Sequence, residues 1–172
     1  MFKNVRWVKE PKGLEIRHTT EKDGDEINRW LQDPQIQKWF PVKTQEEIDF
    51  TVHAWTEYAK YGCALTATIL GEIAGSAVLY LQPYKRMAHQ CLFAIIVDEK
   101  FRGQGTGTKL LNSLFSMAKK RFSLQMLHLE VYRGNPAVSL YERLGFKHCG
   151  IREKFLKDGD EYFDQIIMQK NL

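Results

Sequence analysis

The chain has few cysteines, and their spacing suggests neither a disulfide framework nor a metal site. Only three occur, Cys63, Cys91 and Cys149, far apart and without a Cys-x-x-Cys pair. A disulfide scaffold needs an even set of paired cysteines, and a structural zinc site needs closely spaced ligands. We therefore predict three buried free thiols and no metal site.

Long apolar segments are also missing. The longest apolar runs, residues 77–81 and 91–97, are far shorter than the roughly 20 residues that a membrane-spanning helix needs. Residues 1–6 lack the apolar region of a signal peptide. No repeat, low-complexity stretch or linker interrupts the 172 residues, of which 44% are hydrophobic. These features predict a single cytoplasmic domain over residues 1–172 with no membrane association.

Charge of one sign is not in large excess. The chain carries 25 Lys and Arg against 21 Asp and Glu, a formal net charge of +4. This modest surplus suits a small polyanionic ligand but falls short of what nucleic-acid binding usually requires. We therefore expect no nucleic-acid partner.

The hydrophobic pattern alternates between strand and helix periods. Strands are expected at residues 14–18, 64–70, 73–81, 91–97 and 124–132, with a terminal hairpin at 147–156 and 161–169. Helices are expected at residues 25–31, 44–60, 110–122 and from Asn135 to Gly145, the second with a capping box of Thr44 and Glu47. The prediction is an α/β fold with a mixed, mostly antiparallel central sheet flanked by helices.

What the chain does contain is a glycine-rich loop after an apolar run. Residues 97–107 read Val-Asp-Glu-Lys-Phe-Arg-Gly-Gln-Gly-Thr-Gly and lead into an amphipathic helix. Glycine allows a ligand to approach the main chain, and a helix that starts there directs unpaired N–H groups and its positive dipole end at the ligand. An anionic ligand, most simply a phosphate, is expected there.

Two common phosphate loops do not match this stretch. A P-loop ends in Gly-Lys-Ser/Thr, whereas Lys109 here stands between Thr108 and Leu110. The dinucleotide fingerprint fits Gly103 and Gly105 but meets Thr108 at its third glycine, and no further βα units follow. A dinucleotide-dependent oxidoreductase stays open as an unfavoured alternative.

The pattern Arg-x-x-Gly-x-Gly, at Arg102, Gly105 and Gly107, resembles the acetyl-CoA loop of the GCN5-related N-acetyltransferase (GNAT) family. The likeness continues through a strand and an Asn-Pro-initiated helix with a tyrosine to about residue 146. Within the family, the sequence most resembles the ribosomal-protein N-terminal acetyltransferase branch. It implies a cofactor half at about 91–146 and an N-terminal part at about 14–62 that shapes the acceptor site. The cofactor-binding residues it implies are Ile95, Ile96, Val97, Arg102, Gly103, Gln104, Gly105, Thr106, Gly107, Thr108 and Asn135.

The resemblance also implies two catalytic residues. Tyr141 matches the tyrosine whose hydroxyl is thought to protonate the departing coenzyme A sulfur, although its helical spacing equally fits an ordinary core residue. Glu130 matches a glutamate that acts as base in the ribosomal-protein branch, and it also fits a carboxylate that merely orients substrate. His128, on the same strand face, is a poorer candidate.

The function implied is transfer of an acetyl group from acetyl-CoA to a primary amine by direct attack, with a protein N-terminus or a small amine as acceptor. Aminoglycosides and polyamines are alternative acceptors, and a non-catalytic CoA-binding sensor is an alternative of another class. Trp30, Trp39, Phe40 and Trp55 fit either an acceptor pocket or the core. The sequence leaves open a homodimer.

Overall fold

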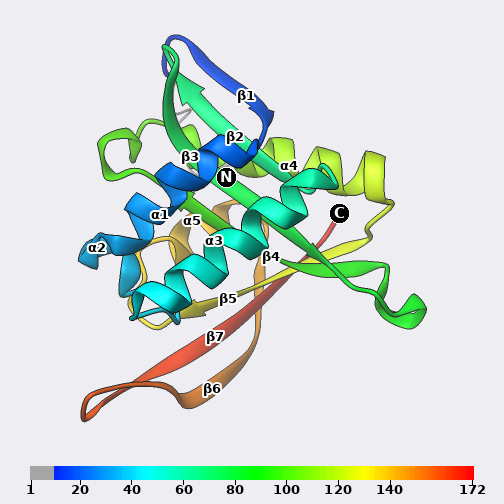
Figure 1. The fold of residues 1–172 in the computed structure, drawn as a ribbon. Helices are drawn as coiled ribbons and strands as arrows, with labels where there is room; N and C mark the ends of the chain where they lie inside the picture. Colours follow the sequence, from blue (N-terminus) through cyan, green and yellow to red (C-terminus); the bar gives the residue numbers. More distant parts are fainter. Residues whose placement is uncertain (1–9) are drawn as a thin grey trace, which may run out of the picture.

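The computed structural model describes residues 10–172, which form one seven-stranded sheet with helices on both faces (Figure 1). The strands are β1 Leu14–His18, β2 Ala64–Ile69, β3 Glu72–Leu81, β4 Gln90–Val97, β5 Met126–Tyr132, β6 Lys147–Asp158 and β7 Glu161–Asn171. The helices are α1 Gly24–Gln32, α2 Pro34–Gln37, α3 Gln45–Lys60, α4 Thr106–Phe122 and α5 Val138–Arg143, with short 3-10 turns η1 Glu21–Asp23, η2 Lys85–Met87 and η3 Glu99–Phe101. The predicted α/β class with a mostly antiparallel sheet is confirmed.

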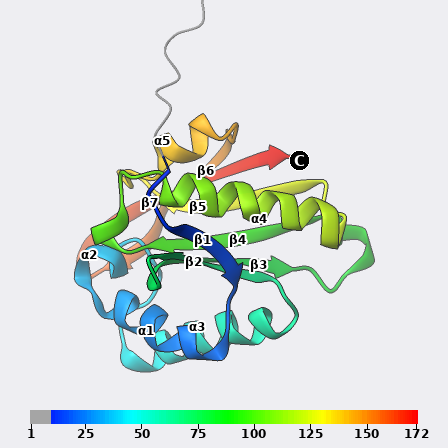
Figure 2. The same ribbon diagram turned by 90° about the horizontal axis from the view of Figure 1, so that it is seen from above.

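Two separate cores lie on the two faces of the sheet. Helix α4 packs Leu110, Leu111 and Leu114 against one face together with Leu127 and Leu129 of β5. Helices α1 and α3 cover the other face, and Figure 2 shows the sheet between these two helical layers. Because neighbouring residues of a strand point to opposite faces, strands β2, β3 and β4 contribute to both cores, whereas β5 and β7 contribute only to the core under α4.

The order of strands is β1-β2-β3-β4-β5-β7-β6, and every neighbouring pair is antiparallel except β4 with β5. That parallel pair is short. It comprises only Gln90 with Met126, Cys91 with Leu127, and Leu92 with His128. Beyond Leu92 and His128 the two strands have no pairing, although β4 continues to Val97 and β5 to Tyr132. The sheet therefore has a gap between β4 and β5 near its middle.

Helix α3 begins where the sequence predicts. The Thr44 hydroxyl accepts the N–H of Glu47, and the Glu47 carboxylate accepts the N–H of Thr44, which satisfies two otherwise unpaired donors of the first turn. A buried polar cluster fixes the start of α1: the carboxylate of Asp23 accepts two hydrogen bonds from the Arg17 guanidinium at 2.7 and 2.8 Å. Local capping and this ion pair thus set how the two helices meet the sheet.

Two sequence predictions need correction. Cys63 and Cys91 are buried, but Cys149 is exposed, because β6 lies at the edge of the sheet, and its thiol donates to the Ile167 carbonyl at 3.3 Å. The helix expected from Asn135 starts only at Val138. Gly145 does end it, with a φ of +90°.

Candidate functional site

The gap between β4 and β5 leaves backbone groups of β4 without a strand partner. The N–H of Asp98 donates to the Ala74 carbonyl of the neighbouring chain segment at 3.0 Å. Since backbone groups alternate in direction along an antiparallel pair, Ile96 also directs its groups toward β3, whereas Phe93, Ile95 and Val97 direct theirs into the gap. Of the three strand residues predicted to meet the cofactor, Ile95 and Val97 thus face the gap with their backbone, and the Ile96 side chain lies in the core.

The glycine loop lies at the carboxyl end of β4. Gly103 has a φ of +71° and Gly105 a φ of +90°, a left-handed conformation that favours glycine. Arg102 stabilises the loop because its Nε donates to the Val97 carbonyl at 2.9 Å. Gln104 does the same through Nε2, which donates to the Lys100 carbonyl at 3.0 Å.

Helix α4 presents unpaired donors at this loop. In the part of the chain that the structure describes, no protein acceptor receives the N–H groups of residues 103–108. The first turn of α4 also contains no acidic residue, so nothing there neutralises the positive end of the helix dipole. The arrangement can bind an anion through several backbone donors at once.

Thr106 gives a separate indication that a ligand belongs here. It is 1% exposed, and its Oγ1 is buried without a hydrogen-bond partner in residues 10–172. A buried hydroxyl without a partner is costly, so the fold is expected to supply one from a bound group. The residues present therefore fit a phosphate-bearing ligand such as acetyl-CoA.

Gly107 has a packing role instead. A Cβ at this position would lie 3.3 Å from Cδ2 of Leu140 and 3.6 Å from Cγ2 of Val97. The absence of a side chain therefore lets α4 approach α5 and the end of β4. Gly103, in contrast, has open space around the position of a Cβ.

Tyr141 lies on the α4 face of the sheet, beside the start of the gap. It is 7% exposed, and its ring packs edge-on against Phe93 at 6.2 Å and Phe146 at 6.0 Å between centroids. Phe93 directly follows the last residue of β4 that pairs with β5. Burial raises the pKa of the Tyr141 phenol, so the hydroxyl stays protonated at neutral pH and can donate a proton or a hydrogen bond.

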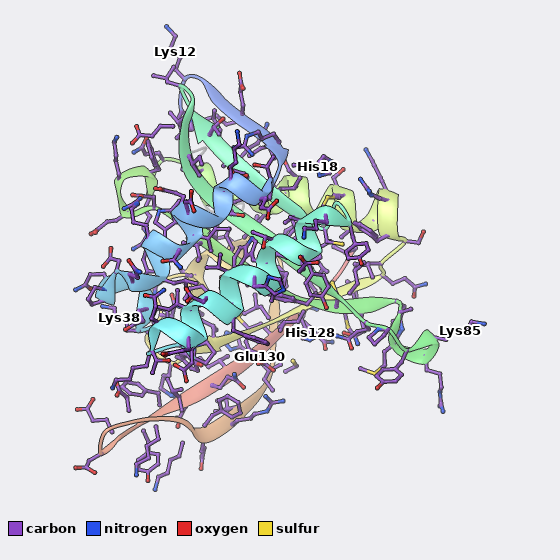
Figure 3. All side chains as sticks on the ribbon, in the orientation of Figure 1. Lys12, His18, Lys38, Lys85, His128 and Glu130 are labelled. Atoms are coloured by element: carbon purple, nitrogen blue, oxygen red, sulfur yellow. The ribbon has the colours of Figure 1, made fainter. Side chains whose placement is uncertain are left out.

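Glu130 lies on the opposite face of the sheet, on the same side as α3 (Figure 3). Its Oε1 accepts from Arg152 Nη1 at 3.1 Å, and its Oε2 accepts from Gln165 Nε2 at 3.1 Å. His128 precedes it on the same face, and burial lowers the pKa of that imidazole although the charge of Glu130 opposes the shift. The two predicted catalytic side chains thus lie on opposite faces of the sheet.

Asn135 is placed as a capping residue of the turn that leads into α5. Its Oδ1 accepts the N–H of Ala137 at 2.9 Å. Its backbone carbonyl accepts the N–H of Val138 at 3.2 Å. The N-cap of α5 is Ala137 and carries no side-chain cap, so the predicted N-cap role of Asn135 is wrong, and its side chain instead stabilises the turn before the helix.

The tryptophans of residues 10–172 divide between core and half-buried positions. Trp30 and Trp55 are fully buried in the core under α1 and α3. Trp39 and Phe40 follow α2 and are half-buried. Only the latter pair can contribute to an acceptor pocket without rearrangement of the core.

Sequence reasoning missed three polar residues at the site. Asp98, just after β4, accepts hydrogen bonds from Trp30 Nε1 at 2.8 Å and from the N–H of Lys100 at 2.9 Å. Arg152 and Gln165 join Glu130 across the terminal hairpin. The carboxylate directly before the loop was a usable signal for Asp98, whereas the pairing of Arg152 with Glu130 needs the strand register.

Residues 10–172 contain neither a membrane-spanning helix nor a cluster of metal ligands. No helix in this range is both long and apolar enough to cross a bilayer. No group of three or more histidine, cysteine, aspartate or glutamate side chains in the same range has the arrangement of a metal site.

Comparison with known proteins agrees on one family. The model of the acetyltransferase (GNAT) family matches residues 25–146. The L-amino acid N-acetyltransferase AaaT of Escherichia coli (strain K12) is 25% identical over 159 residues, which cover 90% of this chain and 96% of that protein. The ribosomal protein bS18-alanine N-acetyltransferase of the same strain is 41% identical over 78 residues, 45% of this chain and 52% of that protein. The crystal structure of ribosomal-protein-alanine N-acetyltransferase from Brucella melitensis has a TM-score of 0.78 at 26% identity and covers 92% of this chain and 99% of that one.

Proposed function

The chain belongs to the acetyltransferase (GNAT) family, and we propose that it transfers the acetyl group of acetyl-CoA to a primary amine at the gap between β4 and β5. One observation carries the assignment of the site: the N–H groups of residues 103–108 have no acceptor in the described chain, and this segment follows the carboxyl end of β4. Acetyl-CoA, when bound, supplies an activated acetyl thioester.

The cofactor site combines backbone and side-chain groups. We propose that the backbone of residues 103–108 binds the pyrophosphate, that Arg102 adds a positive charge beside it, and that the gap-facing groups of Ile95 and Val97 bind the extended arm. A main-chain N–H of this strand can also polarise the thioester carbonyl, which stabilises the negative charge that develops there. We propose that Asn135, in the turn between β5 and α5, also contacts the cofactor.

The two catalytic roles follow from the two faces of the sheet. On the α4 face, the protonated hydroxyl of Tyr141 can deliver the proton that the coenzyme A sulfur takes as it leaves. On the α3 face, the Glu130 carboxylate can receive the proton that an incoming ammonium must lose, directly or through one water. An amine that approaches from the α3 face therefore meets the acyl carbon from the side opposite to the proton donor.

The acceptor is a primary amine, and the relatives point to two kinds. One relative that aligns over 90% of this chain is named for L-amino acids, and another that aligns over 45% is named for the alanine of a ribosomal protein. Both acceptors are α-amines. We therefore place amino acids and protein N-termini ahead of polyamines and aminoglycosides.

A thiol-release assay tests the proposed function. The chain is mixed with acetyl-CoA and, in parallel, with amino acids, peptides with free N-termini, polyamines and aminoglycosides, and free coenzyme A thiol is measured. Release that depends on an amine is expected. Tight binding of acetyl-CoA without release for any amine would instead describe a CoA sensor, and thermal protection by NAD but not by CoA would describe a dinucleotide enzyme.

The single domain over residues 1–172, the cytoplasmic location and the homodimer stay predictions. Strand β6 forms one edge of the sheet, and an exposed edge is a surface on which a second copy can pair. Sedimentation at several concentrations would measure whether the chain dimerises.

A further inference from the structure

The guanidinium of Arg152 is held in one position by its neighbours. Its Nη1 donates to Glu130 Oε1 at 3.1 Å and to Gln165 Oε1 at 2.8 Å. Gln165 is 3% exposed, and its own Nε2 donates to Glu130 Oε2 at 3.1 Å, which closes a ring of three side chains. The ring of Phe155 lies 5.3 Å from the guanidinium carbon and supports it from another side.

The rest of the guanidinium has no acceptor. Arginine has five N–H donors in a fixed plane, and the two hydrogen bonds of Arg152 both start at Nη1. Its Nε and Nη2 therefore have no partner in the described chain, and the side chain is 49% exposed. An oriented guanidinium with a free edge is a receptor for a carboxylate.

Arg152 lies on the acceptor side of the sheet. Arg152 pairs with Gln165 across β6 and β7, and Gln165 pairs with Tyr132 across β7 and β5. Directly paired residues share a face, so Arg152, Gln165 and Glu130 all point away from α4. The core cluster under α1 and α3 contains residues of β2, β3 and β4 but none of β5, β6 or β7, and the Arg152 side chain on this face is 49% exposed.

We propose that Arg152 binds the carboxylate of the acceptor while Glu130 receives its ammonium group, so that the acceptor is a free amino acid. This inference rests on the proposed acetyltransferase function and names its substrate class. The Glu130 carboxylate and the Arg152 guanidinium are in direct contact, with 3.1 Å between Oε1 and Nη1, and the free Nε and Nη2 belong to the same small planar group. Amine and carboxylate must therefore be separated by very few bonds, as in an α-amino acid, where one carbon carries both.

The same geometry disfavours the other acceptors. A protein N-terminus has an amide carbonyl where the amino acid has its carboxylate, so the free edge of Arg152 gains only a neutral acceptor. A polyamine or an aminoglycoside brings a second cation toward the guanidinium, which repels it. Arg152 thus selects for the free carboxylate.

The test compares each L-amino acid of a panel with its own amide. The amide keeps the side chain and the amine, removes only the negative charge, and also imitates a peptide N-terminus. Thiol release from acetyl-CoA gives kcat/KM for both, and the ratio of acid to amide is the readout. This ratio does not change if a variant merely loses overall activity.

The wild-type chain is expected to prefer the acid at least about tenfold for its best amino acid, because hydrogen bonds from a guanidinium to a charged carboxylate are stronger than those to a neutral amide carbonyl. Arg152→Gln should bring the ratio close to one. Lys157→Gln is the matched control, because it also removes a cation from β6. The Nζ of Lys157 lies over the ring of Tyr162. In this variant the ratio of acid to amide should stay at the wild-type value.

Two results would overturn the inference: a wild-type ratio near one, or equal ratios in the wild type and Arg152→Gln. Acetylation of peptides with no amino acid acetylated would also overturn it while the proposed function stands. No amine-dependent thiol release at all would instead refute the proposed function.

Discussion

The indole Nε1 of Trp30 donates to Oδ2 of Asp98 at 2.8 Å, and this hydrogen bond joins helix α1 to the end of β4. Asp98 also accepts from Arg29 Nη2 and from the N–H of Lys100 at the start of η3. Burial alone would raise the pKa of Asp98, but these donors lower it, so the carboxylate is charged at neutral pH. The acceptor-side helix and the glycine loop are therefore fixed to the same side chain.

This link predicts a specific effect of Trp30→Phe. The change keeps an aromatic ring in the core but removes the donor to Asp98, at a cost of about 1–2 kcal/mol in the free energy of unfolding. Because Asp98 positions the residues before the loop, affinity for acetyl-CoA should also fall. Urea unfolding and calorimetry measure the two effects.

Trp55→Phe is the control for that variant. Its indole donates to the buried Ser76 hydroxyl at 3.0 Å, within the same core but without a bond to Asp98. Comparable destabilisation with unchanged cofactor affinity is expected. Equal loss of affinity in both variants would mean that Trp30 acts only through general stability.

Gly103→Ala should weaken cofactor binding without disrupting the fold. Gly103 has a φ of +71° with open space around it, so alanine costs about 1–2 kcal/mol of backbone strain and causes no clash. The strained loop should no longer direct its N–H groups at one point. Calorimetric titration with CoA measures the affinity.

Gly159→Ala provides the comparison, since Gly159 has a φ of +59° and equally open surroundings at the tip of the terminal hairpin. Both variants should lose similar stability, and only Gly103→Ala should lose affinity. If the two bind CoA alike, residues 103–108 are not the anion site.

Tyr141→Phe should lower kcat by about 10²-fold, the lower range for loss of a general acid, with little change in cofactor affinity. The ring remains to pack against Phe93 and Phe146, so the fold should persist. Single-turnover kinetics separates the chemical step from binding. Normal turnover of this variant with the true acceptor would mean that Tyr141 is only a core residue and not the general acid.

Stability should fall in acid through Asp23. Burial alone would raise its pKa, but hydrogen bonds from Arg17, the N–H of Thr20 and Thr66 lower it below the ordinary value of 3.8. A carboxyl whose pKa is lower in the folded state stabilises above the unfolded pKa, and this contribution is lost as pH falls through the folded pKa.

Urea unfolding from pH 7 to about pH 2 measures this dependence, and Asp23→Asn should be less stable at neutral pH with a flatter acid limb. Glu47→Gln serves as the comparison for this variant, because Glu47 is a carboxylate in the exposed capping box of α3. An acid limb that is unchanged in Asp23→Asn would assign the loss of stability to other carboxylates.

The sequence predicts most of the fold because its signals are local. Alternation defines the strands, the stripe of leucines defines α4, and Thr44 with Glu47 defines the start of α3. The closely spaced glycines of the loop predict an anion site in the same way. These features depend on residues within one or two turns of each other.

The parts that the sequence does not predict depend on register and distance. The pairing of β6 with β7 shifts between Arg152 and Leu156, and Lys154 within that irregularity has a φ of +53°. Asp164 fixes it by accepting the N–H of Lys154 at 3.0 Å. No local pattern reveals that such a bulge brings Arg152 to Glu130, or that Trp30 meets Asp98 from 68 positions away.

The most direct test of the cofactor site is a titration of the ¹⁵N-labelled chain with CoA, followed by amide chemical shifts. The largest saturable shifts are expected at the amides of residues 103–108, with further shifts at Ile95 and Val97 in the gap. Saturable binding that leaves these amides unmoved and shifts another region would contradict the assignment of the cofactor site.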